Sequence, residues 1–192
     1  ARGGLKTEYL GEKWFECIKA CSEKAEELGM EAYAYDENGW PSGFAGGKLL
    51  EDIENRDRYL TYTIGDYDEK AHVSYSLDSD RLMRVNSLCP NCLNVYEHYS
   101  ASTADILNPD VVDKFIAITH EQYRKRDKHS LKGFFTDEPQ VSRNGYPWSF
   151  ILDEEYKKAY GDSLLSNLPA LFTEVEGYTL YSNLEIAGNG SS

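Results

Sequence analysis

The hydrophobic and polar positions of the chain repeat one arrangement twice. Residues 12–28 carry apolar side chains at helical spacing with charged side chains between them, which predicts an amphipathic helix that ends at Gly29. The apolar stretch 30–35 follows at once and predicts a short strand. Residues 108–126 then predict a helix opened by an Asn cap and a Pro, and residues 131–135 predict a second strand. This helix–strand rhythm indicates β/α units.

The second of these strands lies in the sequence LKGFFTDEPQ, residues 131–140, and stops on two acids. Its apolar part predicts a fully buried strand, and Pro139 cannot continue it with normal ladder hydrogen bonds. Asp137 and Glu138 therefore stand at the exit of the strand, where placing two carboxylates is costly for stability alone. In α/β proteins, catalytic groups gather at such strand ends.

The first strand ends in the same way, on Asp36 and Glu37, ahead of the turn-forming residues 38–43. If the two strands are neighbours in one parallel sheet, a carboxylate from each can face the same cleft. Two carboxylates across a cleft are the minimum for breaking a glycosidic bond. The competing interpretation is that each acid pair is only a polar turn after a strand. The repetition of the design beside aromatic residues favours the functional interpretation.

Between the two β/α units the pattern changes to period two, which predicts an antiparallel β excursion within residues 58–100. Its strands are expected at residues 59–64, 73–77, 82–85 and 93–96. Short helices are expected at residues 44–54, 153–160 and 163–172.

Composition limits the classes of function. The chain has 192 residues, 41% of them hydrophobic and 28% charged, which is typical of a globular protein with a real core. A net charge of −13 argues against nucleic acid and anionic membrane surfaces as partners. No run approaches the roughly 20 apolar residues of a membrane helix. The 15 Tyr and 3 Trp suit sugar rings, although such residues also fill cores.

Four further residues have more than one interpretation. Trp40 and Trp148 each follow an acidic strand end beside a proline, where they are either sugar-stacking surfaces or ordinary buried side chains. Asp105 either binds a substrate hydroxyl or holds a turn. His120, on the predicted helix, is expected to face solvent or to form a hydrogen bond rather than to bind a ligand.

The four cysteines form two close pairs in the sequence. Cys17 and Cys21 are four residues apart on the first predicted helix, where both can face the core. Cys89 and Cys92 form a lone C-x-x-C motif, whereas a zinc site usually wants a second pair. We therefore expect reduced, structural thiols in a cytoplasmic protein, with no metal and no cofactor.

Several motifs together resemble a known family. Residues 34–47, AYDENGWPSGFAGG, resemble a signature of large bacterial glycoside hydrolase-like proteins related to the α-L-rhamnosidases. Residues 105–112 and 134–140 match two further blocks of that family in the same order. The resemblance implies a (β/α)8 catalytic barrel that hydrolyses glycosidic bonds of plant or host glycans.

A complete barrel of this kind needs about 250 residues. We therefore expect an α/β fold, a partial (β/α)8 TIM-barrel-like domain over residues 1–174 with the β-rich insertion 58–100, and an irregular tail at 175–192. Such a fragment is expected to be inactive alone. Its exposed sheet edges would allow a homo-oligomer. The first residues look internal to a domain, which leaves export open beside the cytoplasmic prediction.

The resemblance also implies roles for individual residues. Asp137-Glu138-Pro139 is similar to the Asn-Glu-Pro of retaining barrel glycosidases, which makes Glu138 the expected general acid. Asp137 replaces the Asn of that motif, and Asp36 or Glu37 is expected to support substrate binding or catalysis. The residues expected to bind a carbohydrate substrate are Arg2, Tyr35, Trp40, Ser42, Asp105, Gln140 and Trp148. The alternative is a carbohydrate-binding relative without catalytic activity.

Overall fold

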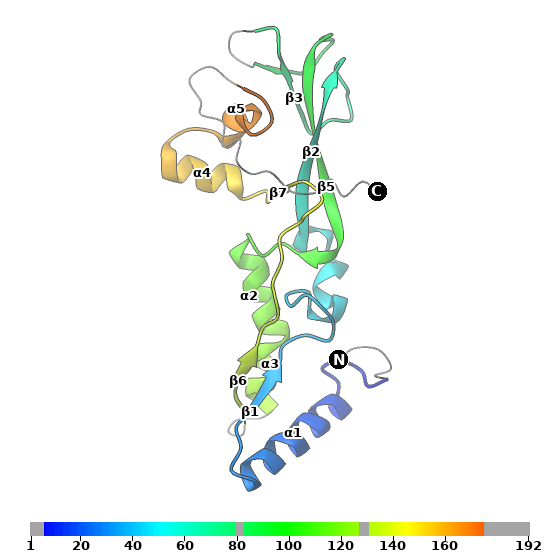
Figure 1. Ribbon diagram of the computed structural model, residues 1–192, viewed down its shortest axis with the longest axis vertical. Helices are drawn as coiled ribbons and strands as arrows, with labels where there is room; N and C mark the ends of the chain where they lie inside the picture. Colours follow the sequence, from blue (N-terminus) through cyan, green and yellow to red (C-terminus); the bar gives the residue numbers. More distant parts are fainter. Residues whose placement is uncertain (1–5, 80–82, 127–130, 175–192) are drawn as a thin grey trace, which may run out of the picture. The chain divides into compact units, whose positions relative to one another are not determined.

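The structure is a computed structural model that describes residues 6–79, 83–126 and 131–174 (Figure 1). The chain divides into two compact units, Ala1–Tyr59 with His98–Ser149 and Leu60–Glu97 with Phe150–Ser192. The first unit holds α1 (Glu12–Glu27), β1 (Ala32–Tyr35), η1 (Ala45–Glu51), η2 (Ile53–Asn55), α2 (Pro109–Ile118), α3 (His120–Arg126), β6 (Leu131–Phe135) and β7 (Tyr146–Trp148). The second holds β3 (Val73–Ser76), β4 (Arg84–Val85), α4 (Leu152–Tyr160), α5 (Leu164–Asn167) and η3 (Leu168–Leu171), while β2 (Arg56–Gly65) and β5 (Cys92–Ala104) contribute residues to both. The predicted tail at 175–192 lies outside the described residues.

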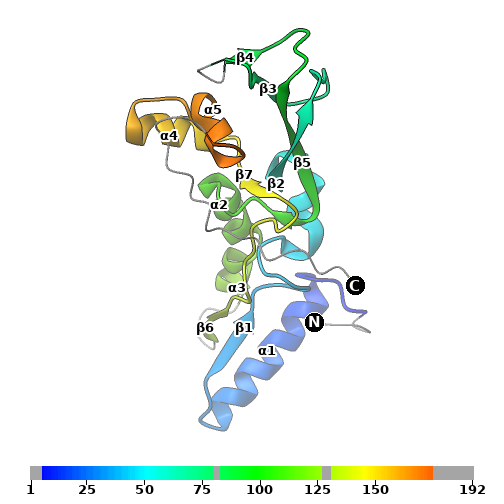
Figure 2. The same ribbon diagram turned by 45° about the horizontal axis from the view of Figure 1, so that its top comes forward.

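Helix α1 confirms the first helix prediction, including its end. Gly29 has a φ of 67°, and its N–H donates to the carbonyl of Glu26 at 3.0 Å. The N–H of Met30 donates to the carbonyl of Ala25 at 2.8 Å. This pair of bonds is the Schellman motif, which satisfies the last carbonyls of the helix and turns the chain into β1. Figure 2 shows α1 running beside β1.

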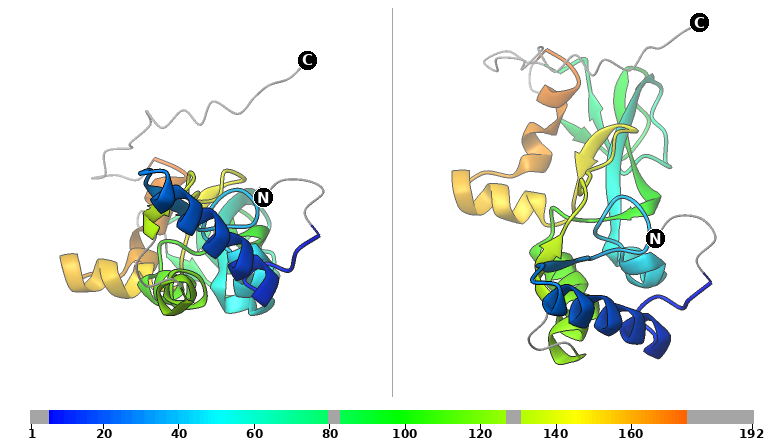
Figure 3. Two further views of the ribbon diagram at one scale, coloured as in Figure 1. Left: turned by 90° about the horizontal axis from the view of Figure 1, so that it is seen from below. Right: turned by 60° about the horizontal axis from the view of Figure 1, so that its bottom comes forward.

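Strands β1 and β6 form a parallel pair in which Ala34 lies opposite Phe134. Helices α1 and α3 lie on the same side of the pair (Figure 3). Phe15 of α1, Ala34 of β1 and Tyr123 of α3 make the buried core between them, with Phe134 packed against it. The rings of Phe15 and Tyr123 meet edge to face at 5.1 Å. One face of the two-stranded sheet is thereby covered.

The prediction that β6 is a fully buried strand is wrong. Phe135 is 58% exposed and Tyr33 of β1 is 59% exposed, because the side chains of a strand alternate and the helices cover only one face. An apolar run bounded by turns does not reveal how many of its faces are covered.

The prediction of a partial (β/α)8 barrel is also wrong. A barrel closes eight parallel strands into one sheet, and each strand pairs with two neighbours. Within the described residues, β1 and β6 form one parallel pair, and the other strands form an antiparallel sheet in the order β4-β3-β5-β2-β7. In this part of the chain the helix–strand rhythm occurs twice, and the period-two segment between its two instances forms four strands of the antiparallel sheet, to which β7 adds the fifth.

The predicted helix at residues 108–126 is present but broken in two at Thr119. Its start follows the prediction, since the side chain of Asn108 accepts the N–H of Asp110 at 3.1 Å. Thr119 leaves helical geometry, with a ψ of −81°, and its hydroxyl donates to the carbonyl of Phe115 at 2.6 Å. His120 therefore begins α3. A second core joins α2 to η1, through Ala45, Leu49, Leu50, Ala104, Val111 and Phe115.

The second unit confirms the antiparallel strands predicted from the period-two pattern. Strand β3 pairs antiparallel with β5, so that Val73 lies opposite Val95. Tyr75, fully buried on β3, donates its hydroxyl to the carbonyl of Leu165 in α5. This bond ties the helical segment to the sheet within the unit.

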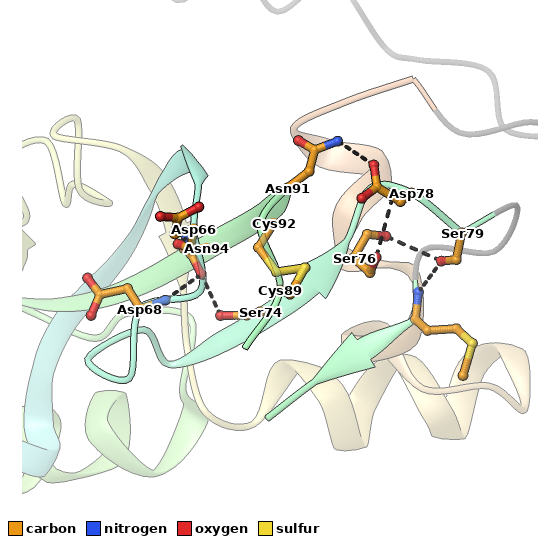
Figure 4. The surroundings of a disulfide bond; sticks show 11 residues. Asp66, Asp68, Ser74, Ser76, Asp78, Ser79, Cys89, Asn91, Cys92 and Asn94 are labelled. Carbon is orange, nitrogen blue, oxygen red and sulfur yellow. Dashed lines mark hydrogen bonds between the residues drawn. A yellow bond between two sulfur atoms is a disulfide. The ribbon is translucent and has the colours of Figure 1, made fainter. Parts of the chain in front are cut away.

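The prediction of reduced thiols is wrong for one cysteine pair. Cys89 and Cys92 form a disulfide, with Cα atoms 6.0 Å apart (Figure 4). Within the turn that it closes, Asn91 donates its side-chain amide to Asp78 at 2.7 Å. Cys17 and Cys21 are free and exposed on α1, so the expectation that they face the core is wrong as well.

Candidate functional site at the ends of β1 and β6

The exits of β1 and β6 are joined by backbone and side-chain hydrogen bonds. The N–H of Asp36 donates to the carbonyl of Phe135 at 3.2 Å, which extends the parallel ladder by one residue. Beyond it, the N–H of Ser42 donates to the carbonyl of Asp137 at 2.9 Å, and the N–H of Asp137 donates to the hydroxyl oxygen of Ser42 at 2.9 Å. The two acidic strand ends therefore meet, which fulfils the condition under which carboxylates from both strands can lie close together.

Asp36 is the centre of this junction. Its carboxylate is fully buried and accepts the hydroxyl of Ser42 on Oδ1 at 2.7 Å and the hydroxyl of Thr136 on Oδ2 at 2.6 Å. Nε2 of His120 lies 3.0 Å from Oδ2. Burial alone would raise the pKa of Asp36, but the hydrogen bonds from His120, Thr136 and Ser42 outweigh it and lower the pKa. The carboxylate is therefore ionised at neutral pH.

His120 is the site residue that sequence reasoning does not identify. Its ring stacks on Phe134 with centroids 4.2 Å apart and meets Phe115 edge to face at 5.6 Å. The side chain is 26% exposed. The break at Thr119 begins a new helix at His120, and 84 residues separate it from Asp36. Neither the break nor the pairing leaves a signal in the local sequence.

Glu37 performs a different task from its neighbour. Its buried carboxylate accepts the backbone N–H groups of Asn38, Phe44, Ala45 and Gly46, at 2.8, 3.1, 2.7 and 2.5 Å. Burial raises the pKa of Glu37, and these N–H groups limit the rise. A carboxylate so engaged closes the loop at residues 38–46 and has no solvent contact in this structure.

Glu138 contrasts with both acids of β1. Its side chain is exposed, and its backbone has a φ of 43°, in the left-handed region that residues other than glycine seldom adopt. Asp137 is half-buried beside it. Backbone strain of this kind clusters at functional sites. Of the two acids at the end of β6, Glu138 is therefore the exposed one.

A pocket of about 220 Å³ lies beside the junction. Its apolar wall comes mainly from α2, including Val111 and Phe115, and its polar end is formed by Asp36, His120 and Thr136. The segment that carries Glu138 borders the pocket through Thr136 and Pro139. The pocket thus combines an apolar wall with the hydrogen-bonded group around Asp36.

The two tryptophans proposed to stack on sugars differ. Trp40 is 48% exposed and its ring is open to solvent, whereas Trp148, on β7, is 4% exposed. The sugar-stacking interpretation of Trp148 is therefore wrong in this structure, and ordinary burial accounts for it. Tyr35 is half-buried and donates its hydroxyl to the carbonyl of Gly39 at 2.5 Å. Gln140 is half-buried, and Arg2 lies outside the described residues.

Asp105 holds a turn, the second of the two roles considered for it. It is fully buried and accepts the hydroxyl of Ser149 at 2.6 Å and the N–H of Leu107 at 3.1 Å. A substrate hydroxyl therefore has no access to it in this structure. Nearby, Asp57 is also buried and accepts the hydroxyl of Thr103 at 3.2 Å. Burial raises the pKa of Asp57 to about 6, opposed by the hydrogen bond from Thr103 and assisted by the charge of Asp105.

Within residues 6–79, 83–126 and 131–174, the structure brings no group of three or more His, Cys, Asp or Glu side chains into an arrangement that could hold a metal ion. None of the helices in the described part of the chain combines the length and the apolar character that crossing a membrane requires. Comparisons with protein-family models, with curated proteins and with solved structures give no match to this chain.

Proposed function

We propose that the ends of β1 and β6 carry the acid–base centre of a glycoside hydrolase, in which Glu138 donates a proton to the glycosidic oxygen. The observation that carries the proposal is the exposed carboxylate of Glu138 on a left-handed residue, at the exit of a strand whose neighbour ends on a buried, ionised Asp36. The sequence blocks that resemble glycoside hydrolases related to α-L-rhamnosidases support plant or host glycans as the substrate class.

The surroundings of Glu138 suit this role. A general acid must reach the leaving oxygen, which an exposed side chain at a strand end can do. Asp36 and Glu37 accept three and four hydrogen bonds respectively, so they fix the loop rather than attack the sugar. The second carboxylate, which takes a proton from the water that attacks the sugar carbon, is therefore a group other than these two. Trp40, on the loop that Glu37 closes, offers an open aromatic face for a sugar ring.

One observation favours a second function. Both acids of β1 are buried and engaged, whereas Trp40 is exposed, and this combination suits a carbohydrate-binding protein without catalysis. In that alternative the exposed polar groups form hydrogen bonds with sugar hydroxyls, and no bond is broken.

The variant Glu138→Gln separates the two functions. It keeps the size and the hydrogen-bonding capacity of the side chain but cannot donate a proton as a carboxylic acid does. We expect hydrolysis of aryl glycosides to fall by roughly 100-fold or more, with sugar binding retained in calorimetry. Glu51→Gln, at an exposed acid on η1, is the matched control and should leave hydrolysis unchanged.

Two results would decide against the hydrolase. One is the absence of hydrolysis by the full-length protein across a broad panel of aryl glycosides. The other is full activity of Glu138→Gln. If sugars then bind to the wild-type chain and Trp40→Ala weakens the binding, the carbohydrate-binding function stands in its place.

A further inference from the structure

A continuous path of hydrogen bonds leads from His120 to the residue before Glu138. Nε2 of His120 contacts Oδ2 of Asp36 at 3.0 Å, and Oδ1 of the same carboxylate accepts the hydroxyl of Ser42 at 2.7 Å. The oxygen of Ser42 in turn accepts the N–H of Asp137 at 2.9 Å. We propose that His120 is a positioning residue, whose protonation sets through this path the conformation of the backbone that carries Glu138.

Asp36 can transmit such a change because it holds the loop after β6 at two points. Thr136 donates its hydroxyl directly to Oδ2, and Asp137 is held through Ser42. The carboxylate is fully buried, so water does not replace a weakened bond. The loop after β6 also carries the left-handed φ of Glu138, a conformation that persists only where its surroundings impose it.

The charge of His120 alters how strongly Asp36 holds the two hydroxyl groups. An imidazolium forms a charge-assisted hydrogen bond with the carboxylate and draws on its negative charge. A neutral imidazole forms an ordinary bond, which leaves more of that charge for the hydroxyl groups of Ser42 and Thr136. Deprotonation of His120 therefore strengthens the hydrogen bonds by which Asp36 holds the loop after β6.

Other titratable groups surround the pair, and the pKa of Glu37, the neighbour of Asp36 in the chain, is raised by burial. Tyr9 donates its hydroxyl to the backbone carbonyl of Asp36 at 2.8 Å, and burial raises its pKa. Burial likewise raises the pKa of Tyr123 to about 12. Glu121, the next residue on α3, pairs with Arg124 at 2.7 Å. From β6 and α2, the rings of Phe134 and Phe115 face His120.

The path can be tested on the full chain without a substrate. In ¹H–¹⁵N spectra recorded from pH 5 to pH 8, we expect the amide resonances of Asp137 and Glu138 to titrate together with the ring resonances of His120. His120→Gln keeps an N–H donor near Asp36 but has no titration, so both amide shifts should lose this dependence on pH. Ser42→Ala removes the middle link, and we expect His120 to titrate while Asp137 does not follow. His72→Gln, at a second histidine 3.6 Å from a carboxylate, is the control and should leave both amides unchanged.

A third variant tests the hydrogen bond itself. His120→Phe retains the stacking on Phe134 but has no donor for Asp36, which leaves still more of the carboxylate charge for Ser42, so we expect hydrogen exchange at the Asp137 amide to slow by about tenfold, a gain of local protection. If the Asp137 and Glu138 amides titrate alike in the wild type and in His120→Gln, the proposal is overturned. Unchanged exchange in His120→Phe overturns it as well.

The effect of His120 on catalysis rests on the proposed function and is measured separately, through kcat and KM. We expect His120→Phe to lower kcat by about tenfold with little change in KM, because a small displacement of a catalytic group is costly. His120→Gln should restore most of the rate and remove the dependence of kcat on the His120 titration. A full-length wild-type protein without hydrolysis contradicts the proposed function, whereas the spectra still decide whether the path exists.

Discussion

The carboxylate of Glu37 accepts a hydrogen bond of 2.7 Å from the backbone N–H of Ala45, eight residues further along the chain. The N–H groups of Asn38, Phe44 and Gly46 donate to the same carboxylate. A single side chain thus satisfies four backbone donors and closes the loop in which Ser42 lies. Because Ser42 links Asp36 to Asp137, the geometry at the end of β6 depends on a carboxylate that never touches it.

Replacing this carboxylate by an amide should destabilise the first unit. In Glu37→Gln the side-chain NH₂ group faces backbone N–H groups, and buried donors lose their partner. We expect the free energy of unfolding to fall by roughly 2 to 4 kcal/mol, measured by urea denaturation at pH 7. Glu26→Gln, on the exposed face of α1, should change it by less than about 0.5 kcal/mol. Equal stability of the two variants would refute the structural role of Glu37.

Alanine substitutions at Gly46 and Gly47 test the packing of the same loop, because the two glycines share a left-handed backbone but differ in their neighbours. Both have positive φ, 63° and 95°, so alanine is strained at either position. A Cβ on Gly46 would in addition lie 2.7 Å from the ring of Tyr9, whereas nothing lies within 4 Å of one on Gly47. We expect Gly47→Ala to cost about 1 kcal/mol and Gly46→Ala about 1 to 3 kcal/mol more, by the same urea titration. A smaller loss for Gly46→Ala would contradict the contact with Tyr9.

The sequence predicts local structure better than it predicts the partners of each strand. Helix α1, the Asn108 cap and the period-two strands follow from spacing and capping alone. The acids at the ends of β1 and β6 are likewise visible in the sequence, because a carboxylate after an apolar run is conspicuous. The adjacency of the two strands could only be posed as a condition.

Other features depend on contacts between distant residues. Whether Phe135 is covered depends on the helices present on each face of β6, and no property of the local run encodes that. Asp36 and Glu37 look equivalent in the sequence, yet one collects side-chain donors and the other backbone donors. His120 joins the site only because the helix breaks at Thr119, and propensity does not anticipate that break.

Asp57 should make stability depend on pH. Its pKa is about 6 in the folded chain against an ordinary 3.8, so folding favours the protonated carboxyl. The contribution is fully present below pH 3.8 and is lost as the pH rises through 6, a change of roughly 3 kcal/mol. We expect Asp57→Asn to gain stability relative to the wild type by this amount between pH 4 and pH 8, in urea titrations at each pH.

The comparison with Asp57→Asn isolates this one group, because every other acid, such as Asp36 with its lowered pKa, is present in both chains. Asp113→Asn, at an exposed position of α2, should follow the wild type at every pH. A difference between Asp57→Asn and the wild type that stays constant from pH 4 to pH 8 would rule out the raised pKa.

The left-handed backbone of Glu138 should lower the stability of the folded chain. At its φ of 43°, a residue with a Cβ is destabilised by about 1 to 2 kcal/mol. Glycine has no such strain, but it loses more backbone entropy on folding, which offsets part of the gain. We therefore expect Glu138→Gly to raise the free energy of unfolding by about 0.5 to 1 kcal/mol and, under the proposed function, to lower hydrolysis by roughly 100-fold or more. Glu138→Gln keeps the Cβ and should leave stability unchanged with the same loss of hydrolysis. Since the two variants lose the same carboxylate, their difference in urea midpoint reports the backbone alone. A glycine variant less stable than the glutamine variant would show that the left-handed residue is not strained, and the argument that links the strain to function would fail with it.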